Sequence, residues 1–147
     1  MRSLPLGINN ERRLKSLTGL NYKKYEILLS KFTTIYNQQT ERTSHKKERK
    51  RQLGGGRKSK LSSIEMKLLF VLYYLKAYPT FDLLGDRFDM ASSTANKQLH
   101  KLMPILEMTL TKLEVMPKRS FETPVTLKTY LEAQGGVEKL LIPKYRD

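Results

Sequence analysis

The sequence predicts an all-α fold, a small helical bundle that contains a helix-turn-helix, on the strength of three observations. Apolar residues recur at helical spacing between residues 21 and 38. The apolar run Leu68 to Leu75 follows a helix-start signal. Two shorter helical patterns then succeed one another between Thr80 and Leu102, separated by a turn of about three residues.

Composition narrows the class of protein. Hydrophobic residues make up 39% of the 147 residues, which is enough for one core with basic appendages. The chain has no Cys, so disulfides, zinc–thiolate sites and cysteine nucleophiles are excluded, and a reducing compartment is favoured. No signal peptide is expected, because no long apolar stretch follows the N-terminal charges. The longest apolar run is far shorter than the roughly 18 residues of a membrane span.

The charge of the chain is strongly asymmetric. The net charge is +14; residues 1–60 carry 16 Lys/Arg against 4 Asp/Glu, and residues 61–147 carry 12 against 10. A basic arm of net +12 beside a body of net +2 suits binding to a phosphate backbone, where each Lys or Arg releases condensed counterions. A solvated tail, an anionic membrane surface and an acidic protein partner are the alternatives that charge alone leaves open.

The first 60 residues divide into three predicted segments. Residues 1–20 contain Pro5 and Gly7 and show no sustained period, so they are interpreted as a loose leader. Residues 21–41 are predicted to form a helix that frays after Gln38. Its stripe at helical spacing, interpreted as core rather than as base-stacking residues, consists of Tyr22, Tyr25, Leu28, Leu29, Phe32, Ile35 and Tyr36.

The third segment, residues 42–60, is a basic linker or arm with nine Lys/Arg and one acid, Glu48. Three glycines, Gly54 to Gly56, favour a flexible joint within it. A phosphate-binding loop is rejected, because Gly56 is followed by Arg57 instead of Lys-Ser/Thr and no strand precedes it.

Residues 61–116 are predicted to form the helix-turn-helix domain. Ser62 and Glu65 have the spacing of a capping box, which starts a helix that Pro79 terminates after Ala77. This helix is apolar nearly all round and should therefore lie at the centre of the bundle. A short helix over Thr80 to Phe88 is predicted next, with Thr80 as its cap, Asp82 in its first turn, and Leu83, Leu84 and Phe88 facing inward.

A further helix should begin near Ser92 and be kinked or restarted by Pro104, which cannot donate to the carbonyl of His100. Its predicted inward residues are Ala95, Leu99, Leu102, Leu106, Leu110 and Leu113. The C-terminal extension, residues 117–147, is predicted to hold a helix over Thr126 to Ala133 and a short strand, Val137 to Ile142, without an evident partner.

The segment Thr80 to Leu102 meets the requirements of a helix-turn-helix one by one. Gly85 provides the small residue where the two helices cross, Asp89 tolerates the left-handed conformation of the turn, and Met90 provides an apolar plug. The outward face of the second helix should then be polar and basic: Ser92, Ser93, Thr94, Asn96, Lys97, His100 and Lys101. The alternative is an ordinary solvated helix in a bundle, and the adjacent basic arm favours DNA binding over it.

In a DNA-binding protein these two parts would have different tasks. Asn can pair with adenine, and Ser, Thr and Lys can reach bases or phosphates from the start of a recognition helix. The basic segment would follow phosphates and supply affinity without sequence preference. Its candidate contact residues are Lys46, Lys47, Arg49, Lys50, Arg51, Arg57, Lys58 and Lys60.

No catalytic constellation is expected, and neither a metal nor a cofactor. The chain has two His, His45 and His100, without Cys or a nearby carboxylate pair. The densest acidic group is Asp82, Asp86 and Asp89; the helix dipole explains Asp82 and the turn explains Asp89 better than a metal does.

An ordered series of motifs resembles a known family. The series is Gly54-Gly55-Gly56-Arg57-Lys58-Ser59-Lys60-Leu61, Lys67 to Lys76, Tyr78-Pro79-Thr80, Leu83-Leu84-Gly85 and Ser92 to Lys97. It is similar to the N-terminal region of bacterial insertion-sequence DDE transposases, which carries the helix-turn-helix of DDE superfamily endonuclease, and the similarity extends from about Thr18 to Ile142.

The resemblance implies recognition of the terminal inverted repeats of a mobile element, in the bacterial cytoplasm at the nucleoid. In that family the catalytic part is a ribonuclease-H-like domain further along, where three acidic residues hold two divalent metals. A strand resembling Leu140-Leu141-Ile142 leads there into the first catalytic Asp, whereas here Pro143 to Asp147 follow and no position matches that acid. The resemblance therefore implies a module truncated before the catalytic domain, without enzymatic activity or a small-molecule substrate of its own.

Two other functions stay open at the level of the sequence. The chain could occupy the ends of an element, or pair with itself or with a full-length transposase, and so regulate or inhibit transposition. Alternatively, it could bind RNA or nucleic acid in general through the basic arm alone, in which case residues 61–147 would be dispensable for binding.

Overall fold

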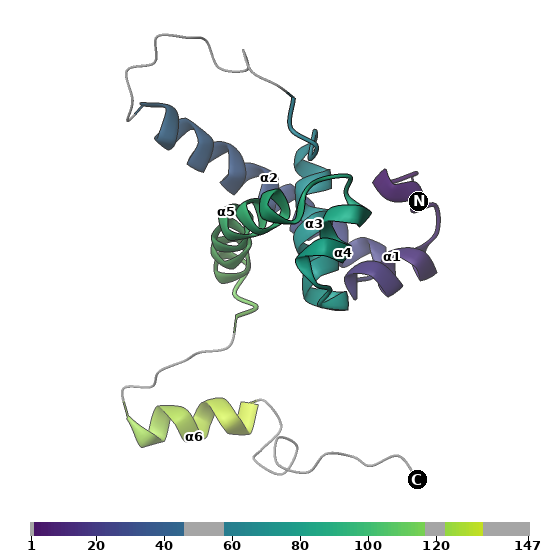
Figure 1. Cartoon of the computed structure of the whole chain (residues 1–147). Helices are drawn as coiled ribbons and strands as arrows, with labels where there is room; N and C mark the ends of the chain where they lie inside the picture. Colours follow the sequence, from purple (N-terminus) through teal and green to yellow (C-terminus); the bar gives the residue numbers. More distant parts are fainter. Residues whose placement is uncertain (1, 46–57, 117–122, 134–147) are drawn as a thin grey trace. The chain divides into compact units, whose positions relative to one another are not determined.

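The structure, a computed structural model, describes residues 2–45, 58–116 and 123–133. The chain divides into two compact units, Met1–Val115 and Met116–Asp147. Within the described ranges, the first unit contains α1 (Glu11–Thr18), α2 (Tyr22–His45), α3 (Ile64–Ala77), α4 (Phe81–Arg87) and α5 (Ser92–Lys112), and the second contains α6 (Pro124–Ala133) (Figure 1). Besides a 3-10 turn at Pro5–Gly7, no other regular element occurs among the described residues. The predicted all-α class is confirmed.

Residues 1–20 pack as part of the bundle, so their interpretation as a loose leader is wrong. Leu4, Ile8 and Leu14 are buried in the core. Asn10 caps α1 by accepting the Arg13 backbone N–H at 2.8 Å, and Gly19 ends it at φ 78. A helix of only eight residues shows too few turns for its apolar period to be recognised in a sequence.

The long helix α2 carries the predicted apolar stripe, with Tyr25, Leu28, Phe32 and Ile35 buried. It does not fray after Gln38 but continues to His45, beyond the predicted boundary. Hydroxyl groups in its polar half donate to carbonyls one turn earlier, for example Thr43 to Gln39 at 3.0 Å, and so are satisfied within the helix.

Helix α3 lies at the centre of the unit, as predicted. Five consecutive residues, Leu68 to Leu72, are buried, which requires neighbours on every side of the helix. Helices α1, α2 and α5 all pack against α3. The predicted cap is wrong by one residue: Ser63, and not Ser62, accepts the Met66 N–H at 3.0 Å.

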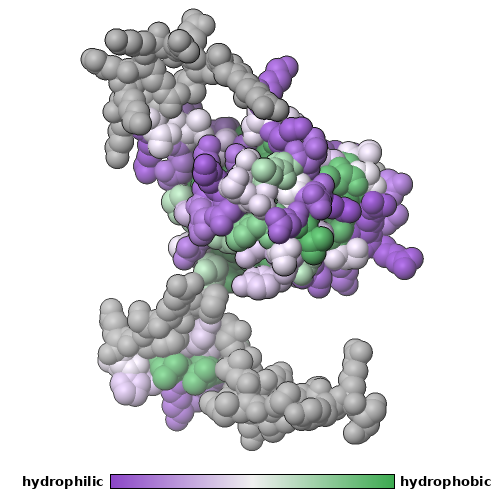
Figure 2. Space-filling model, in the orientation of Figure 1, coloured by the Kyte–Doolittle hydropathy of each residue, from purple (hydrophilic) through white to green (hydrophobic). Residues whose placement is uncertain are grey.

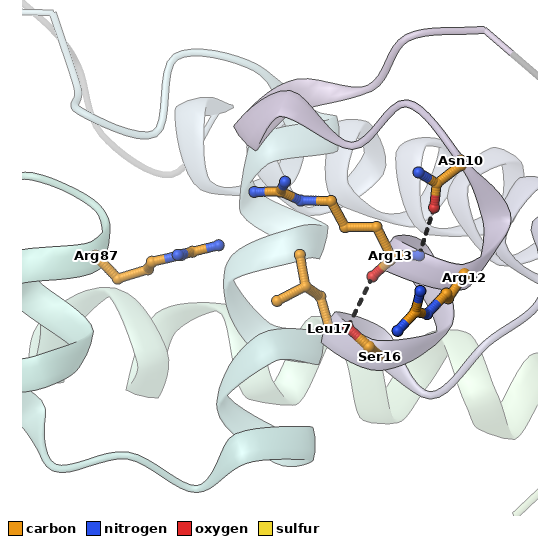
Figure 3. A pocket seen from close by; sticks show the side chains of 6 residues that line it. All are labelled: Asn10, Arg12, Arg13, Ser16, Leu17 and Arg87. Atoms are coloured by element: carbon orange, nitrogen blue, oxygen red, sulfur yellow. Dashed lines mark hydrogen bonds between the residues drawn. The ribbon is translucent and has the colours of Figure 1, made fainter.

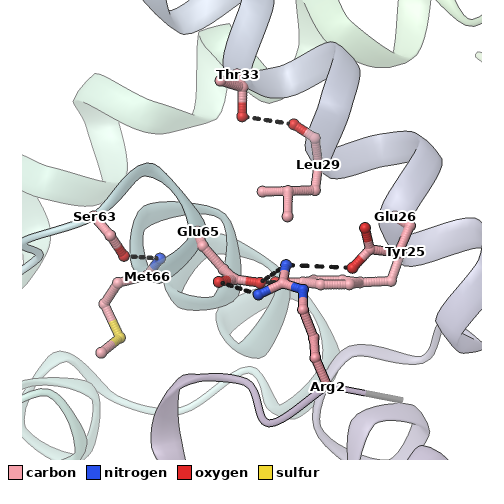
Figure 4. A network of polar contacts seen from close by, with 8 residues as sticks. All are labelled: Arg2, Tyr25, Glu26, Leu29, Thr33, Ser63, Glu65 and Met66. Carbon is pink, nitrogen blue, oxygen red and sulfur yellow. Dashed lines mark hydrogen bonds and ion pairs between the residues drawn. The ribbon is translucent and has the colours of Figure 1, made fainter.

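Glu65 does not complete a capping box but joins a polar network that ties the N-terminus to α2 and α3 (Figure 4). Arg2 donates to Glu65 at 2.8 Å and to Glu26 at 3.3 Å. The Tyr25 hydroxyl donates to the same Glu65 carboxylate at 3.2 Å. Burial of the Tyr25 side chain, together with the Glu65 charge, holds the pKa of the phenol well above its ordinary value.

The helices α4 and α5 follow the prediction with two exceptions. Leu84 and Phe88 are buried, but Leu83 is 60% exposed, so its predicted inward orientation is wrong. Leu83 lies in the first turn of α4, where its backbone N–H donates to the Thr80 cap and its side chain faces solvent. Pro104 does not restart the helix, since α5 is one element from Ser92 to Lys112.

In the second unit, α6 confirms the helix predicted over Thr126 to Ala133 and begins two residues earlier, at Pro124. Proline is favoured at the first position of a helix because its missing N–H would be unpaired there. The predicted strand Val137 to Ile142 lies outside the described residues. Among the described residues, no helix combines the length and hydropathy that a membrane crossing needs.

Candidate nucleic-acid interface

The closest approach in the α4–turn–α5 segment is at Gly85. A Cβ atom added there would lie 2.4 Å from the carbonyl oxygen of Met90 and 3.3 Å from the backbone nitrogen of Ser92. The Met90 N–H in turn donates to the Gly85 carbonyl at 2.9 Å. Contact at this distance leaves no space for a side chain, which confirms the predicted crossing residue.

The turn itself depends on Asp89, which adopts φ 53. Asp is among the few residues other than Gly that visit this left-handed conformation at low cost, as the sequence predicted. Its carboxylate forms an ion pair with the Lys60 ammonium, and this hydrogen bond and charge lower the pKa of Asp89. The acid nearest to the start of α5 is therefore neutralised by a basic residue.

Helix α5 has the two faces that the sequence predicted for its first three turns. Ala95, Leu99 and Leu102 are buried, and Met90 is half-buried beside them. The predicted outward residues are all exposed or half-buried: Ser92, Ser93, Thr94, Asn96, Lys97, His100 and Lys101. Figure 2 shows hydrophilic residues over much of the visible face of the helical unit, with smaller apolar patches between them.

The beginning of α5 is electrostatically positive. Its N-cap, Ala91, makes no side-chain hydrogen bond to the helix, and no acidic residue lies in the first turn. The first backbone N–H groups therefore keep the partial positive charge of a helix N-terminus. Further along, burial and the nearby Lys101 charge lower the pKa of Lys67, whose ammonium donates to the Leu61 carbonyl at 2.5 Å.

A groove of about 590 Å³ is lined both by part of the basic segment and by residues of α5. Lys58, Ser59 and Lys60 form one wall, and Thr94 and Gln98 of α5 lie on the other. Three predicted site residues from two predicted groups, Lys58, Lys60 and Thr94, thus line the same groove. The sequence analysis did not include Gln98; its place one helical turn after Thr94 was the signal that could have identified it.

The remaining predicted residues of the basic segment lie outside the described residues: Lys46, Lys47, Arg49, Lys50, Arg51 and Arg57. Within the described ranges, no three or more His, Asp or Glu side chains gather as a metal site would require. His100 is exposed on α5, and Asp82 and Asp86 are exposed on α4.

Comparison with known families gives a match at this site. Residues 59–112 match the family model described as the helix-turn-helix of DDE superfamily endonuclease. The match begins at Ser59, which lines the groove, and ends at Lys112, the last residue of α5. It therefore contains α3, α4, α5 and the crossing at Gly85. The resemblance seen in the sequence motifs is confirmed over this segment. No curated protein and no solved structure matches the chain.

Proposed function

We propose that this chain recognises a specific sequence of double-stranded DNA, because residues 59–112 match the family model described as the helix-turn-helix of DDE superfamily endonuclease. In this proposal the exposed face of α5 enters the major groove. Ser92, Ser93 and Asn96, near the start of the helix, contact base edges there.

One observation carries the proposal: the crossing at Gly85 fixes α5 so that one face is buried and the opposite face is polar, basic and free of acids in its first turn. A merely solvated helix has no need of such close approach between the two helices. A helix that reads base edges does need a fixed position, because its side chains must be held in place on a rigid element to contact those edges.

The basic segment 42–60 contributes affinity in this proposal, through phosphates rather than bases. Its described end, Lys58 to Lys60, lies against the turn and the first turns of α5. Phosphate contacts from this segment would fix the register of the protein on the duplex without selecting a sequence.

The proposed biological role is recognition of the terminal inverted repeats of a mobile element. The family match supports it, because the matched module belongs to endonucleases of the DDE superfamily. The helical unit would supply recognition and no chemistry, acting in the bacterial cytoplasm at the nucleoid. In a regulatory form of the same role, the chain would occupy the ends, or pair with itself or a full-length transposase.

The first experiment selects duplexes from a random pool with the full chain and then measures binding of the enriched duplex at several salt concentrations. A reproducible motif whose preference over random duplex persists in higher salt is expected. Binding without preference, lost steeply as salt rises, would leave only electrostatic attraction and contradict the proposal. Equal competition by double-stranded RNA would favour the general nucleic-acid function instead.

The role in transposition has a separate test. The selected motif should occur as inverted repeats at the ends of a mobile element, and coexpression with the active element should change its transposition frequency. A fall in frequency would support the regulatory form, whereas a motif unrelated to any inverted repeat would contradict end recognition and leave DNA binding itself intact.

A further inference from the structure

A second basic cleft lies away from the groove beside α5, between α1 and α4. It has a volume of about 450 Å³ and is lined by Asn10, Arg12, Arg13, Ser16, Leu17 and Arg87. Half of these residues are arginines and none is acidic. None of the three arginines was among the residues that the sequence predicted for DNA binding, and two of them precede the segment matched by the family model.

The arginines reach the cleft from two helices. Figure 3 shows Arg13 extending from α1 toward the side on which Arg87 projects from α4, with Arg12 and Ser16 lower on α1. The Asn10 side chain at the start of α1 is occupied as the helix cap, where it accepts the Arg13 backbone N–H at 2.8 Å. The cleft is therefore a fixed concave surface between packed elements.

All three guanidinium groups are exposed, and within the described ranges none of them forms an ion pair. The neighbouring carboxylate on α1, Glu11, is engaged elsewhere, because it accepts the Tyr22 N–H at 3.2 Å. The Arg87 guanidinium carbon lies 5.5 Å from the centre of the Tyr73 ring, a cation–π contact that restrains its position. Three positive charges thus line one concave site without a carboxylate partner among the described residues, and a bound anion would offset their mutual repulsion.

We propose that the Arg12–Arg13–Arg87 cleft binds phosphates of the DNA backbone beside the groove that α5 occupies. The guanidinium fork matches the geometry of phosphate oxygens and can donate two parallel hydrogen bonds to them. This inference rests on the proposed function, since it places a second contact on the same duplex. It adds a positioning contact that does not read the sequence.

The position of Arg87 in the chain is compatible with both contacts on one duplex. Arg87 is the last residue of α4, and the exposed Ser93 of α5 follows six residues later. Six residues span at most about 20 Å when fully extended. The major groove is about 12 Å wide, and each strand presents a phosphate about every 3.4 Å, so backbone phosphates flank the recognition helix within that range.

The test compares two triple variants of the full chain on the selected duplex and on random duplex. One variant is Arg12→Gln, Arg13→Gln, Arg87→Gln. The other, Lys15→Gln, Lys23→Gln, Lys24→Gln, makes the same change in charge at exposed residues of α1 and α2 that do not line the cleft. Circular dichroism and thermal melting establish that both triple variants fold. If loss of the Arg87–Tyr73 contact unfolds the arginine variant, the double variant Arg12→Gln, Arg13→Gln replaces it in the test.

The arginine variant should lower the affinity for both duplexes by the same factor and flatten the salt dependence. The negative slope of log Kobs against log salt should decrease in magnitude by about 0.9 for each phosphate contact that is lost. The lysine variant should keep nearly the wild-type slope. In addition, neutral methylphosphonate substitutions made one at a time at phosphates flanking the motif should weaken binding of the wild type at several positions, and at least one of these positions should lose its effect in the arginine variant while the phosphates contacted by the basic segment keep theirs.

Several outcomes would overturn the inference. Equal slopes for the two triple variants would show that the arginines add only general charge. The same set of methylphosphonate-sensitive phosphates in the wild type and in the arginine variant would place all the phosphate contacts elsewhere. Binding to phosphatidylserine vesicles that the arginine variant loses, with DNA binding unchanged, would assign the cleft to a membrane surface. In each case a preserved preference for the selected duplex leaves the proposed function standing, whereas absence of any preference in the wild type contradicts that function instead.

Discussion

The backbone of Met90 lies so close to Gly85 that a Cβ atom on the glycine would be 2.4 Å from the Met90 carbonyl oxygen. The atom that would be struck belongs to the backbone of the turn and cannot swing aside as the end of a side chain can. The angle between α4 and α5, and with it the position of the α5 outer face, therefore depends on the absence of one methyl group.

Replacing Gly85 with Ala tests this relationship, because the close contact predicts a loss of stability where an ordinary helical position would show a gain. At an unconstrained helical position, Gly→Ala stabilises a protein by up to about 1 kcal/mol. Here the extra methyl group should destabilise the fold, by about 1–3 kcal/mol, because α4 and the turn must move apart. Urea unfolding monitored by circular dichroism measures the change, and a gain in stability would contradict the close crossing.

The N-cap of α3 gives a prediction with a matched control. Ser63→Ala should lower the free energy of unfolding by about 1 kcal/mol, because the Met66 N–H loses the hydroxyl that accepts it at 3.0 Å. The neighbouring Ser62→Ala should change stability by less than about 0.5 kcal/mol, since Ser62 is exposed and is not the cap. The opposite order of effects would restore the capping box that the sequence suggested.

The buried phenol of Tyr25 predicts a loss of stability in alkali. Because burial, reinforced by the Glu65 charge, raises the pKa of Tyr25 in the folded state, its contribution is fully present below the ordinary tyrosine pKa of about 10. As pH rises above that value, the unfolded chain loses this proton and the folded one keeps it. The free energy of unfolding should then fall by about 1.4 kcal/mol per pH unit from this group alone.

Tyr25→Phe removes that contribution, so its stability should decline less steeply between pH 10 and 11 than that of the wild type. The variant also loses the hydrogen bond to Glu65, which lowers its stability at neutral pH and makes the slope the decisive quantity. Parallel curves for the two proteins would mean that Tyr25 titrates in the folded state as it does in the unfolded chain.

The recognition face and the basic segment should differ in how mutations affect specificity. Asn96→Ala is expected to cost about 1–3 kcal/mol on the selected duplex and much less on random duplex. Neutralising Lys46, Lys47, Arg49, Lys50 and Arg51 should weaken binding to all DNA alike and flatten its salt dependence. Fluorescence anisotropy with both duplexes separates the two effects, and an equal loss on random duplex for Asn96→Ala would remove α5 from the role of recognition helix.

Long periodic elements and the turn chemistry were predictable from the sequence. The stripe of α2, the all-round apolar α3 and the crossing residue Gly85 each follow from a local rule that tertiary structure did not override. The same holds for Asp89, whose left-handed conformation is one that few other residue types accept.

Features that depend on contacts distant in sequence were not predictable. Glu65 has the spacing of a capping residue, but Arg2 and Tyr25, 63 and 40 residues away, bind its carboxylate instead. Leu83 looks like a core residue on a helical wheel, yet in the packed structure Leu84 and Phe88 are the buried residues of this segment and Leu83 is exposed. The Arg12–Arg13–Arg87 cleft, too, exists only because α1 packs beside α3, and this brings it near the end of α4.

The packing of α2 against α3 and α5 determines how the basic segment is attached to the protein. Residues 46–57 join His45 to Lys58, and both of these residues belong to the same compact unit. Both ends of the segment are therefore held in the unit that contains α5, so its charges stay within a chain length of that helix. In the proposed function, binding of a duplex by α5 would therefore bring those charges to neighbouring phosphates of the same duplex in an intramolecular step. Deleting α3 to α5 would also expose the apolar stripe of α2. The contributions of the basic segment and of α5 to DNA binding are therefore better separated by neutralising charges than by truncation.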